Sequence, residues 1–242
     1  MKVFAISDLH LPGGDNKPMD IFGPHWEGHF EKICRDWRQR VGSEDLVLIA
    51  GDISWAMQLK EAKADLDAIG ALPGHKVILR GNHDYWWNTI TQVRQALPQS
   101  MKAVQNDCVV YDDVVVCGSR GWTPIPPDGK LGPDDQKIHD REVMRMRLSL
   151  ENARKKAEGR PILVMMHYPP MNEKWEDSPF TEMFEEFGVS QVVYGHLHGG
   201  SIRGAFNGEK GGVGYQLTSC DGLNFALWEW QNTSGKIEKI IE

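Results

Sequence analysis

The stretch VILRGNHD, residues 77–84, is the part of the sequence that decides the fold. It begins as an apolar run of strand length, Val77–Leu79, and then passes through Arg80 and a glycine into Asn82, His83 and Asp84. In open α/β sheets, ligands bind outside the carboxyl ends of the strands, where such polar side chains would lie. The stretch therefore indicates an α/β fold with a functional site at a strand end.

Other apolar runs of similar length end in the same kinds of polar residue. In chain order, the runs Val3–Ile6, Leu46–Ala50, Ile162–Met166 and Val192–Tyr194 lead into Asp8 and His10, Asp52, His167, and His196 and His198. The runs are continuous rather than alternating, which suits strands covered on both faces. Because these strand ends can meet at one sheet edge, we expect their polar side chains to form one site.

Helical segments separate the early strands, and the later part of the chain is richer in strands. Further strands are predicted at Val114–Cys117, Gln216–Thr218 and Phe225–Trp230, and helices at Phe30–Arg40, Gln58–Ile69, Ile90–Leu97, Lys137–Lys156 and Thr181–Phe187. Ala62, Leu66 and Ile69 show the three-to-four-residue spacing of an amphipathic helix. The pattern predicts a layered α/β or α+β sandwich.

The composition is that of an ordinary globular protein of 242 residues, with 40% hydrophobic and 25% charged residues. We expect a single domain over residues 1–242, with the proline- and glycine-rich stretch at residues 121–135 forming a loop on the rim of the site. A domain boundary at that stretch is the alternative. The net charge of −7 argues against a broad nucleic-acid-binding surface.

No segment approaches the roughly 20 apolar residues that a membrane span requires. The apolar run at the N-terminus reaches Asp8 too soon for the core of a signal peptide, so we expect a cytoplasmic protein. The four cysteines are scattered and form no CxxC pair, which favours free thiols. The oligomeric state stays open.

The polar residues at the strand ends offer oxygen and imidazole ligands and no thiolate. This donor set suits manganese, iron, zinc, nickel or cobalt rather than a calcium cage or an iron–sulfur cluster. The candidate ligands are Asp8, His10, Asp52, Asn82, His167, His196 and His198. They are too many for one four-coordinate ion and suit two ions that share a bridging carboxylate. The glycines before Asp52, Asn82 and His196 fit a sharp turn with close backbone approach.

The motifs, taken in order, resemble those of the calcineurin-like metallophosphoesterase superfamily. The resemblance rests on Asp8-Leu9-His10, Gly51-Asp52, Gly81-Asn82-His83-Asp84, His167 and Gly195-His196-Leu197-His198. It implies a four-layer α/β/β/α sandwich of two mixed β-sheets flanked by helices, with a dinuclear metal site at the carboxyl ends of strands. The implied cofactors are two metal ions, of which Mn²⁺, Fe²⁺ or Fe³⁺, and Zn²⁺ are the leading candidates.

The same resemblance implies a role for each candidate residue. One metal would be held by Asp8, His10, Asp52 and His198, and the other by Asp52 as the bridge together with Asn82, His167 and His196. His83 would be the catalytic histidine that is not a ligand and faces the scissile phosphate. A hydroxide bridging the metals would attack phosphorus in line, and His83 would donate a proton to the leaving group or stabilise transition-state charge.

The sequence departs from the protein Ser/Thr phosphatase branch at residues 51–58, where GDISWAMQ replaces the pattern GDxVDRG. This argues against phosphoprotein phosphatase activity and removes the aspartate that would support His83 from that position. Asp84 is a substitute partner. The expected function is hydrolysis of a small-molecule phosphate ester, either a diester or a monoester. A nuclease and a non-catalytic metal-binding scaffold are the alternatives, the first disfavoured by the lack of a basic tract and the second by the complete ligand set.

Residues near the motifs are candidates for contact with the substrate. Trp55, Trp86 and Trp122 could stack on an aromatic group, while the alternative for each is a packed core side chain. Arg80 and Arg203 are candidate phosphate contacts, and Asp84 belongs to the same set. His25 and His29 could reach the mouth of the site, although solvated loop positions are favoured for both.

Overall fold

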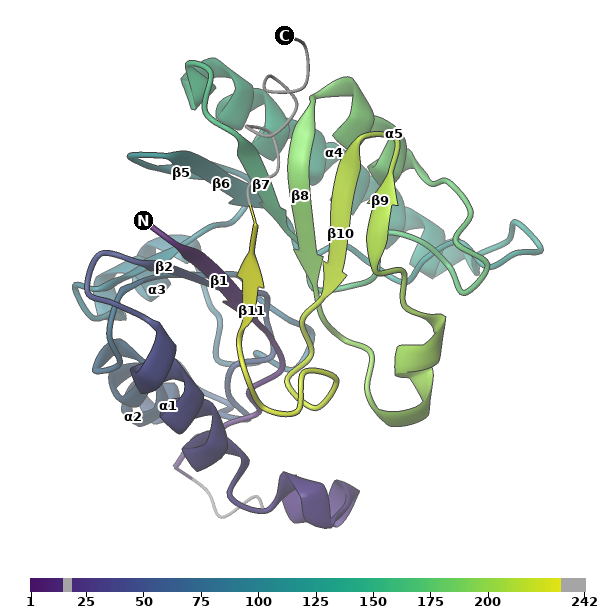
Figure 1. Ribbon diagram of the computed structural model, residues 1–242. Helices are drawn as coiled ribbons and strands as arrows, with labels where there is room; N and C mark the ends of the chain where they lie inside the picture. The colour runs from purple at the N-terminus through teal and green to yellow at the C-terminus, as the bar shows by residue number, and fades with distance from the viewer. Residues whose placement is uncertain (15–18, 232–242) are drawn as a thin grey trace, which may run out of the picture.

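Two β-sheets form the centre of the protein, as seen in a computed structural model that describes residues 1–14 and 19–231 (Figure 1). The first sheet has the order β11-β1-β2-β3-β4, in which β1 to β4 are parallel and β11 is antiparallel to β1. Its strands are β1 (Val3–Ile6), β2 (Leu46–Ile49), β3 (His75–Ile78), β4 (Met101–Ala103) and β11 (Trp228–Trp230).

The second sheet has the order β5-β6-β7-β8-β10-β9. Strands β6, β7, β8 and β10 run parallel, and the two edge strands β5 and β9 are antiparallel to their neighbours. Its strands are β5 (Cys108–Tyr111), β6 (Val114–Gly118), β7 (Ile162–Met165), β8 (Val189–Tyr194), β9 (Gly208–Lys210) and β10 (Val213–Leu217).

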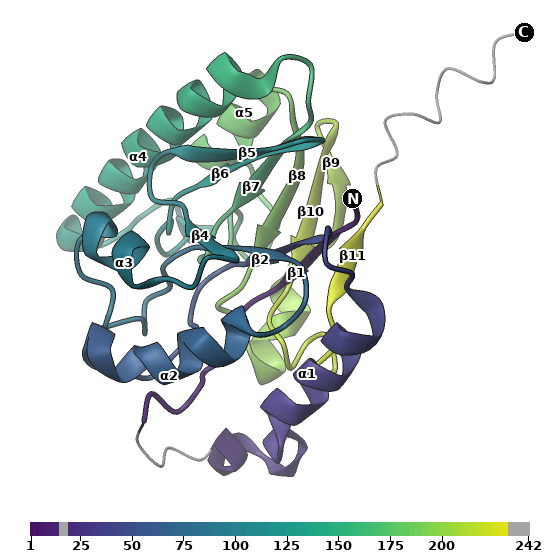
Figure 2. The same cartoon turned by 90° about the vertical axis from the view of Figure 1, so that its left-hand side faces the viewer.

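Helices cover the outer face of each sheet (Figure 2). The helices are α1 (His29–Arg40), α2 (Leu59–Gly70) and α3 (Ile90–Ala96) on the first sheet, and α4 (Pro133–Ala157) and α5 (Pro179–Glu186) on the second. The order helices, sheet, sheet, helices confirms the predicted four-layer α/β/β/α sandwich with two mixed sheets.

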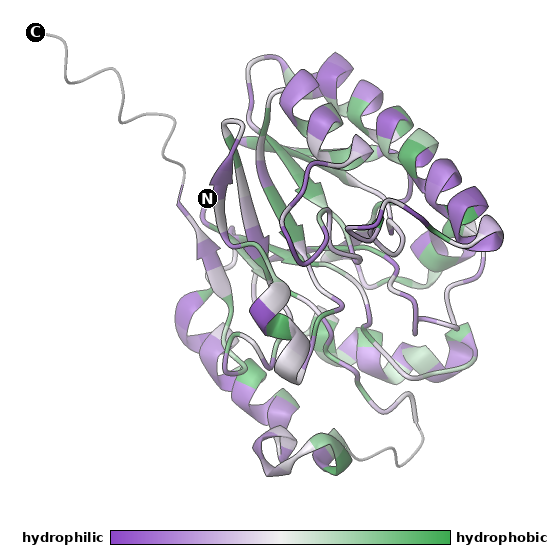
Figure 3. Cartoon of the chain, turned by 90° about the vertical axis from the view of Figure 1, so that its right-hand side faces the viewer, coloured by the Kyte–Doolittle hydropathy of each residue, from purple (hydrophilic) through white to green (hydrophobic). Residues whose placement is uncertain are grey.

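Each continuous apolar run is divided between two apolar layers. In β1, Val3 and Ala5 pack between the sheets, whereas Phe4 and Ile6 pack against the helices on the outer face. The reason is that successive side chains of a strand point to opposite faces. Figure 3 shows the same division as hydrophobic strands inside and hydrophilic outer faces on the helices. The expectation of strands covered on both faces is therefore confirmed.

The carboxyl ends of the parallel strands in both sheets lie at a shared edge. There the two sheets are joined directly, since the backbone N–H of Ser7 donates to the carbonyl of Thr218 at 2.8 Å. This junction brings the segments after β1 to β3 next to the segments after β7, β8 and β10. The fold thus collects polar residues that are far apart in the sequence.

Several boundaries differ from the sequence-based expectation. Strands β4, β5 and β9 were not predicted; β4 and β9 contain only three residues each, and β9 is largely exposed. The irregular loop is shorter than residues 121–135, since Pro133 occupies the first turn of α4, where its missing N–H leaves no bond unmade. Residues 15–18 and 232–242 of the expected single domain lie outside the described residues. Among the residues that are described, no helix is both long and apolar enough to cross a bilayer.

Candidate metal centre

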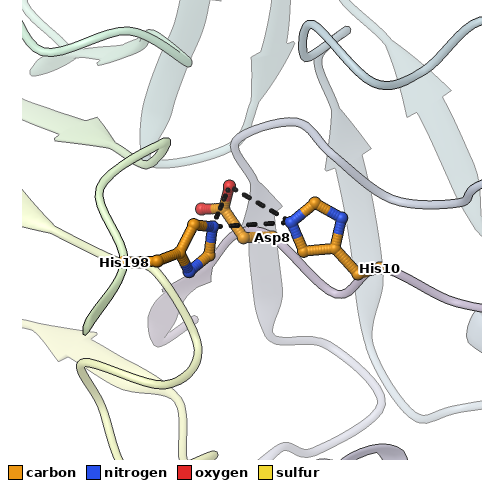
Figure 4. Close-up of side chains that lie close together, drawn as sticks. All are labelled: Asp8, His10 and His198. Carbon is orange, nitrogen blue, oxygen red and sulfur yellow. Dashed lines mark hydrogen bonds and ion pairs between the residues drawn. The ribbon is translucent and has the colours of Figure 1, made fainter. Parts of the chain in front are cut away.

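Three of the predicted ligands converge beyond the ends of β1 and β8 (Figure 4). Nε2 of His198 lies 3.3 Å from Oδ1 of Asp8. Nε2 of His10 lies 3.4 Å from Nε2 of His198 and 4.0 Å from Oδ1 of Asp8. The carboxylate and the two imidazoles therefore direct their ligand atoms toward one small volume.

A second group of predicted ligands lies beside the first. Nε2 of His167 is 3.4 Å from Oδ2 of Asp52 and 2.6 Å from Oδ1 of Asn82. Oδ1 of Asn82 is also 2.9 Å from Nδ1 of His196. Oδ2 of Asp52 lies 3.9 Å from Nε2 of His10, so this one oxygen faces both groups. All seven predicted ligands are thus brought together.

The backbone at this edge adopts an uncommon conformation. Asp8, His10, Asp52 and His196 have φ angles of 59°, 46°, 51° and 73°, in the left-handed region that residues other than glycine rarely visit. Such residues cost roughly 1–3 kcal/mol each and are retained where the surroundings demand them, mostly at functional sites. All four residues are predicted ligands, so this uncommon backbone conformation coincides with the site.

Glycines allow the strand ends to approach the ligand groups. A Cβ atom on Gly81 would lie 2.1 Å from Oδ1 of Asp52, and one on Gly195 would lie 2.4 Å from Oδ2 of Asp8. A Cβ on Gly51 would lie 2.7 Å from Nδ1 of His167. The close approach that the sequence predicts at these glycines is therefore confirmed.

The buried carboxylates at the centre favour the binding of a cation. Asp8 and Asp52 are buried, and histidines are their only ion-pair partners within the described residues. Burial by itself would raise the pKa of each carboxyl, but contacts with His198 at Asp8 and with His167 at Asp52 lower both. Two buried carboxylates without a lysine or arginine partner would be stabilised by a coordinated metal. Oxygen and imidazole donors suit divalent transition ions, so the residues fit such ions.

The histidines divide into two pairs by their surroundings. Burial lowers the pKa of His10 and of His196 to about 4, which leaves both rings neutral and able to coordinate a metal. Burial opposes the charge on His167 and His198 as well, but the neighbouring carboxylates overcome it. Asp52 helps raise the pKa of His167 to about 9, and Asp221 and Asp8 raise that of His198 to about 10.

Acceptors behind the ligands orient two of the rings. Nδ1 of His198 is 2.9 Å from Oδ1 of Asp221, and Nδ1 of His167 is 3.0 Å from the carbonyl oxygen of Ala50. Such contacts orient each ring so that Nε2 faces the cluster, where a bound metal would replace the proton that the raised pKa favours. The sequence analysis missed Asp221, which lies in the loop after β10; its position beyond the end of a strand was the available signal.

His83 lies at the border of the ligand cluster. Its ring centroid is 4.7 Å from that of Trp55 and 5.9 Å from that of His10. Nδ1 of His83 is 3.3 Å from the hydroxyl of Tyr85, and its backbone N–H donates to Oδ1 of Asp52 at 2.8 Å. The ring is therefore close to the centre without being one of the converging ligands.

The structure corrects the expectation for Asp84 as a partner of His83 and as a substrate contact. Asp84 is completely buried, and its carboxylate accepts hydrogen bonds from the backbone N–H groups of Asp52, Ile53, Ser54 and Gly81 and from the indole of Trp86. Burial raises the pKa of Asp84 to about 6, and the charge of Asp52 adds to this effect. Asp84 holds the loop that carries Asp52, and Tyr85 contacts His83 instead.

The three candidate tryptophans have different environments. Trp55 stacks on His10 with ring centroids 4.7 Å apart and an interplanar angle of 20°, so it lies at the site as predicted. Trp86 is fully buried in the core and donates to Asp84, which rules out contact with a substrate and corrects that expectation. Trp122 packs against Tyr168 at 5.2 Å, and Tyr168 packs against His196 at 4.2 Å.

The two candidate arginines lie outside the ligand cluster. Arg80 is half-buried, and burial lowers its pKa, with Arg120 adding to the effect and Asp84 and Glu142 opposing it. Arg203 is exposed at the end of a 3-10 helix, Gly199–Gly204. Neither is among the described residues that line the cavity beside the ligands, so the structure does not support a phosphate contact for them.

Hollows adjoin the cluster on two sides. A cavity of about 310 Å³ borders His10, Asp52, His83, His196 and His198. The sequence analysis missed most of its other wall, because Met19, Phe22 and Trp26 lie in short 3-10 helices without a periodic pattern. His25 is exposed, as favoured, and it also lines this cavity. A second hollow of about 520 Å³ touches His196 and is lined in part by Thr123, Pro124 and Pro126 of the rim loop.

The sequence matches the family model described as calcineurin-like phosphoesterase over residues 1–200. The chain belongs to this family, as the fold and the ligand cluster indicate. Membership of this family supports metal-dependent hydrolysis of phosphoesters in general and implies divalent metal ions. The predicted resemblance is therefore confirmed.

Individual relatives are more distant. The chain is 38% identical over 86 residues to the Gene 66 protein of Mycobacterium phage D29, a match that covers 34% of this chain and 40% of that protein. The chain thus spans less than half the length of this curated relative. Among solved structures, it resembles the phosphopantetheinyl hydrolase of Mycobacterium tuberculosis, with 14% identity, a TM-score of 0.56 and coverage of 90% of this chain and 88% of the other. It also resembles the protein TT1561 of Thermus thermophilus, with 11% identity, a TM-score of 0.56 and coverage of 95% and 98%. These two likenesses concern the fold alone.

Proposed function

We propose that this chain is a dinuclear metallophosphoesterase that hydrolyses the phosphate ester of a small molecule. The observation that carries the proposal is the position of Asp52. Its Oδ2 lies 3.4 Å from Nε2 of His167 and 3.9 Å from Nε2 of His10, so it faces both ligand groups as a bridging carboxylate would. Two ions at such a site can hold both the attacking and the leaving oxygen of an in-line displacement.

The ligand groups divide between two metal positions. Asp8, His10 and His198 converge on one side of Asp52, and Asn82, His167 and His196 converge on the other. Mn²⁺, iron and Zn²⁺ suit these donors. When bound, divalent ions act as Lewis acids and activate water for attack on phosphorus.

His83 would act on the leaving group. Because Nδ1 of His83 contacts the Tyr85 hydroxyl, Nε2 is the ring atom available to a substrate in the cavity. A proton held at Nε2 could pass to the leaving oxygen, and general acid catalysis of this kind contributes typically about 10²–10⁴-fold. The neighbouring rings of Trp55 and His10 fix the place of the imidazole.

The alternatives are a nuclease and a metal-binding scaffold without catalysis. The cavity at the site has about 310 Å³, a size that suits a small organic group better than a polymer. A scaffold requires no catalytic histidine, whereas His83 lies at the border of the ligand cluster and of the cavity. These observations support the small-molecule esterase.

The experiment compares the wild type, His83→Asn and His75→Asn after loading with Mn²⁺. Hydrolysis of 4-nitrophenyl phosphate and bis(4-nitrophenyl) phosphate is measured together with metal content. We expect the wild type to hydrolyse at least one ester and His83→Asn to keep its metal but lose about 10²–10⁴-fold in kcat. His75 is a suitable control because it begins β3, at the opposite end from the site, and packs against Tyr111. A wild type that binds metal and hydrolyses neither ester would favour the scaffold.

A further inference from the structure

The cavity beside the ligand cluster has two unlike walls. One wall is formed by the candidate ligands and His83, and the other by apolar and aromatic side chains. The second wall, which we call the aromatic wall, comprises Met19, Phe22, His25, Trp26 and Trp55. Because both walls border the same space of about 310 Å³, a phosphate at the ligands would place its organic group against the aromatic wall.

The base of the aromatic wall is held in place by packing. Trp26 is only 3% exposed, and its ring meets Phe225 and His29 edge-on at centroid distances of 5.2 and 5.4 Å. Trp55 stacks on His10 and lies against His83. Two rings fixed in this way form a wall that exists before a ligand arrives, which lowers the entropic cost of binding.

The mouth of the cavity carries an exposed aromatic side chain. Phe22 is 59% exposed and lies in the 3-10 helix Met19–Phe22, a hydrophobic turn at the lower edge of Figure 3. Its neighbour Ile21 is 74% exposed and does not line the cavity. An exposed aromatic ring at the entrance to a site is available to contact a ligand without any rearrangement of the core.

The cavity offers little to a second anionic group. None of the described residues that line it is a lysine or an arginine. Asp221, an acidic residue of the lining, is already engaged with Nδ1 of His198 and the backbone N–H of Gly199. A ligand with further phosphates or carboxylates would therefore bring those charges into a cavity whose described lining offers them no lysine or arginine, which is unfavourable.

We infer that the substrate is a phosphate ester whose organic group is aromatic or apolar and uncharged, and that Phe22 is a specificity-determining residue. The inference rests on the proposed function, since it takes the ligand cluster as the place of the phosphate. The volume lies at the lower end of the roughly 300–1,000 Å³ of small-molecule sites. This size suits one ring system, which would lie between Phe22 at the mouth and Trp55 and Trp26 at the base.

Phosphonates test this inference, because they carry the phosphate-like group but cannot be hydrolysed as esters. The Kd values of phenylphosphonate, methylphosphonate and 3-phosphonopropionate are measured by calorimetry on the Mn²⁺-loaded protein. Aromatic contacts contribute about 0.5–1.5 kcal/mol beyond area burial, so we expect phenylphosphonate to bind about tenfold more tightly than methylphosphonate. The carboxylate of 3-phosphonopropionate should give no gain over methylphosphonate.

The variants locate the selectivity on one side chain. Phe22→Ala should reduce the preference for phenylphosphonate several-fold through weaker binding of that ligand. Ile21→Ala is the matched control, because it removes an exposed apolar side chain from the same turn that does not line the cavity. Its preference for phenylphosphonate should equal that of the wild type.

The outcomes separate this inference from the proposed function. Equal Kd values for phenyl- and methylphosphonate, binding of neither, or tighter binding of 3-phosphonopropionate would overturn the inference even if phosphate esters are hydrolysed. Retained selectivity in Phe22→Ala would overturn the role of Phe22. The proposed function is decided separately by ester hydrolysis, and its failure leaves a protein that binds phosphonates but does not turn over 4-nitrophenyl esters.

Discussion

Nδ1 of His198 lies 2.9 Å from Oδ1 of Asp221, while Nε2 of the same ring lies 3.3 Å from Oδ1 of Asp8. The imidazole is thus held between two carboxylates, one within the ligand cluster and one behind it. A carboxylate behind a histidine ligand fixes the ring and increases its basicity, and loss of such a partner typically costs about 10–100-fold in metal affinity or activity.

For Asp221→Ala we therefore expect an apparent affinity for Mn²⁺ about 10–100-fold below that of the wild type, measured by competition with a chelator. Asp221→Asn should recover part of the loss, since an amide oxygen can still accept from Nδ1. Asp112→Ala serves as the control, because Asp112 is an exposed aspartate in the turn between β5 and β6 and is not part of the ligand cluster. Identical affinities for Asp221→Ala and the wild type would show that Asp221 does not support the site.

Asp52→Asn should lower the metal content at both positions, because the substitution removes a carboxylate charge that faces both groups of ligands. The measurement is metal per chain by elemental analysis after dialysis, with circular dichroism to check folding. Asp65→Asn is a matched control, since Asp65 is also buried and accepts from Gly13 and Ser54 outside the ligand cluster. Loss of a single ion from Asp52→Asn would contradict a bridging role.

Gly195→Ala should impair the site by steric conflict. The new Cβ would lie 2.4 Å from both Oδ2 of Asp8 and Oγ of Ser7. Overpacking of this kind costs typically about 1–3 kcal/mol in stability, and displacement of Asp8 should weaken metal binding as well. Gly200→Ala introduces the same methyl group where no atom lies within 4 Å, and it should change neither urea stability nor metal affinity. Equal behaviour of the two variants would argue against close packing at Gly195.

Lys76 should make the stability of the protein depend on pH. It is completely buried in β3, its ammonium contacts the carbonyls of Gly70 and Leu72, and burial lowers its pKa from 10.5 to about 8. Between these values the unfolded chain binds more protons than the folded one, so the free energy of unfolding rises with pH, by up to about 3 kcal/mol.

Lys76→Met should remove that slope between pH 8 and pH 10.5, whereas Lys102→Met, at an exposed position of β4, should keep it. Urea unfolding at the two pH values gives the comparison. The same pH dependence in Lys76→Met as in the wild type would mean that the buried amine titrates normally.

Much of the site could be predicted because its chemistry is local to strand ends. Asp8, Asp52 and His167 each follow a continuous apolar run. Because parallel strands have their carboxyl ends at the same edge of a sheet, residues that follow such runs can meet there. The close backbone approach at each glycine before a ligand could also be predicted, because only a residue without a Cβ atom allows it. These signals need no knowledge of the tertiary packing.

The remainder depends on packing that no local pattern encodes. Trp55 and Trp86 follow Asp52 and His83 at the same spacing of three residues, yet one borders the cavity and the other is in the core. Likewise Asp84 is next to His83 in sequence, but its carboxylate turns to the backbone of residues 52–54. The aromatic wall at residues 19–26 is built from short 3-10 turns, which lack the periodicity that marks a helix or a strand.

The direct junction of the two sheets at Ser7 and Thr218 has a thermodynamic consequence. The candidate ligands before residue 100 follow strands of the first sheet, and those after it follow strands of the second. An ion bound there would contact ligands from both sheets. Metal binding and the association of the two sheets are therefore thermodynamically linked. Removal of the metal by a chelator should therefore increase the rate of hydrogen exchange at the Ser7 amide before it increases the exchange rates of amides in the outer helices.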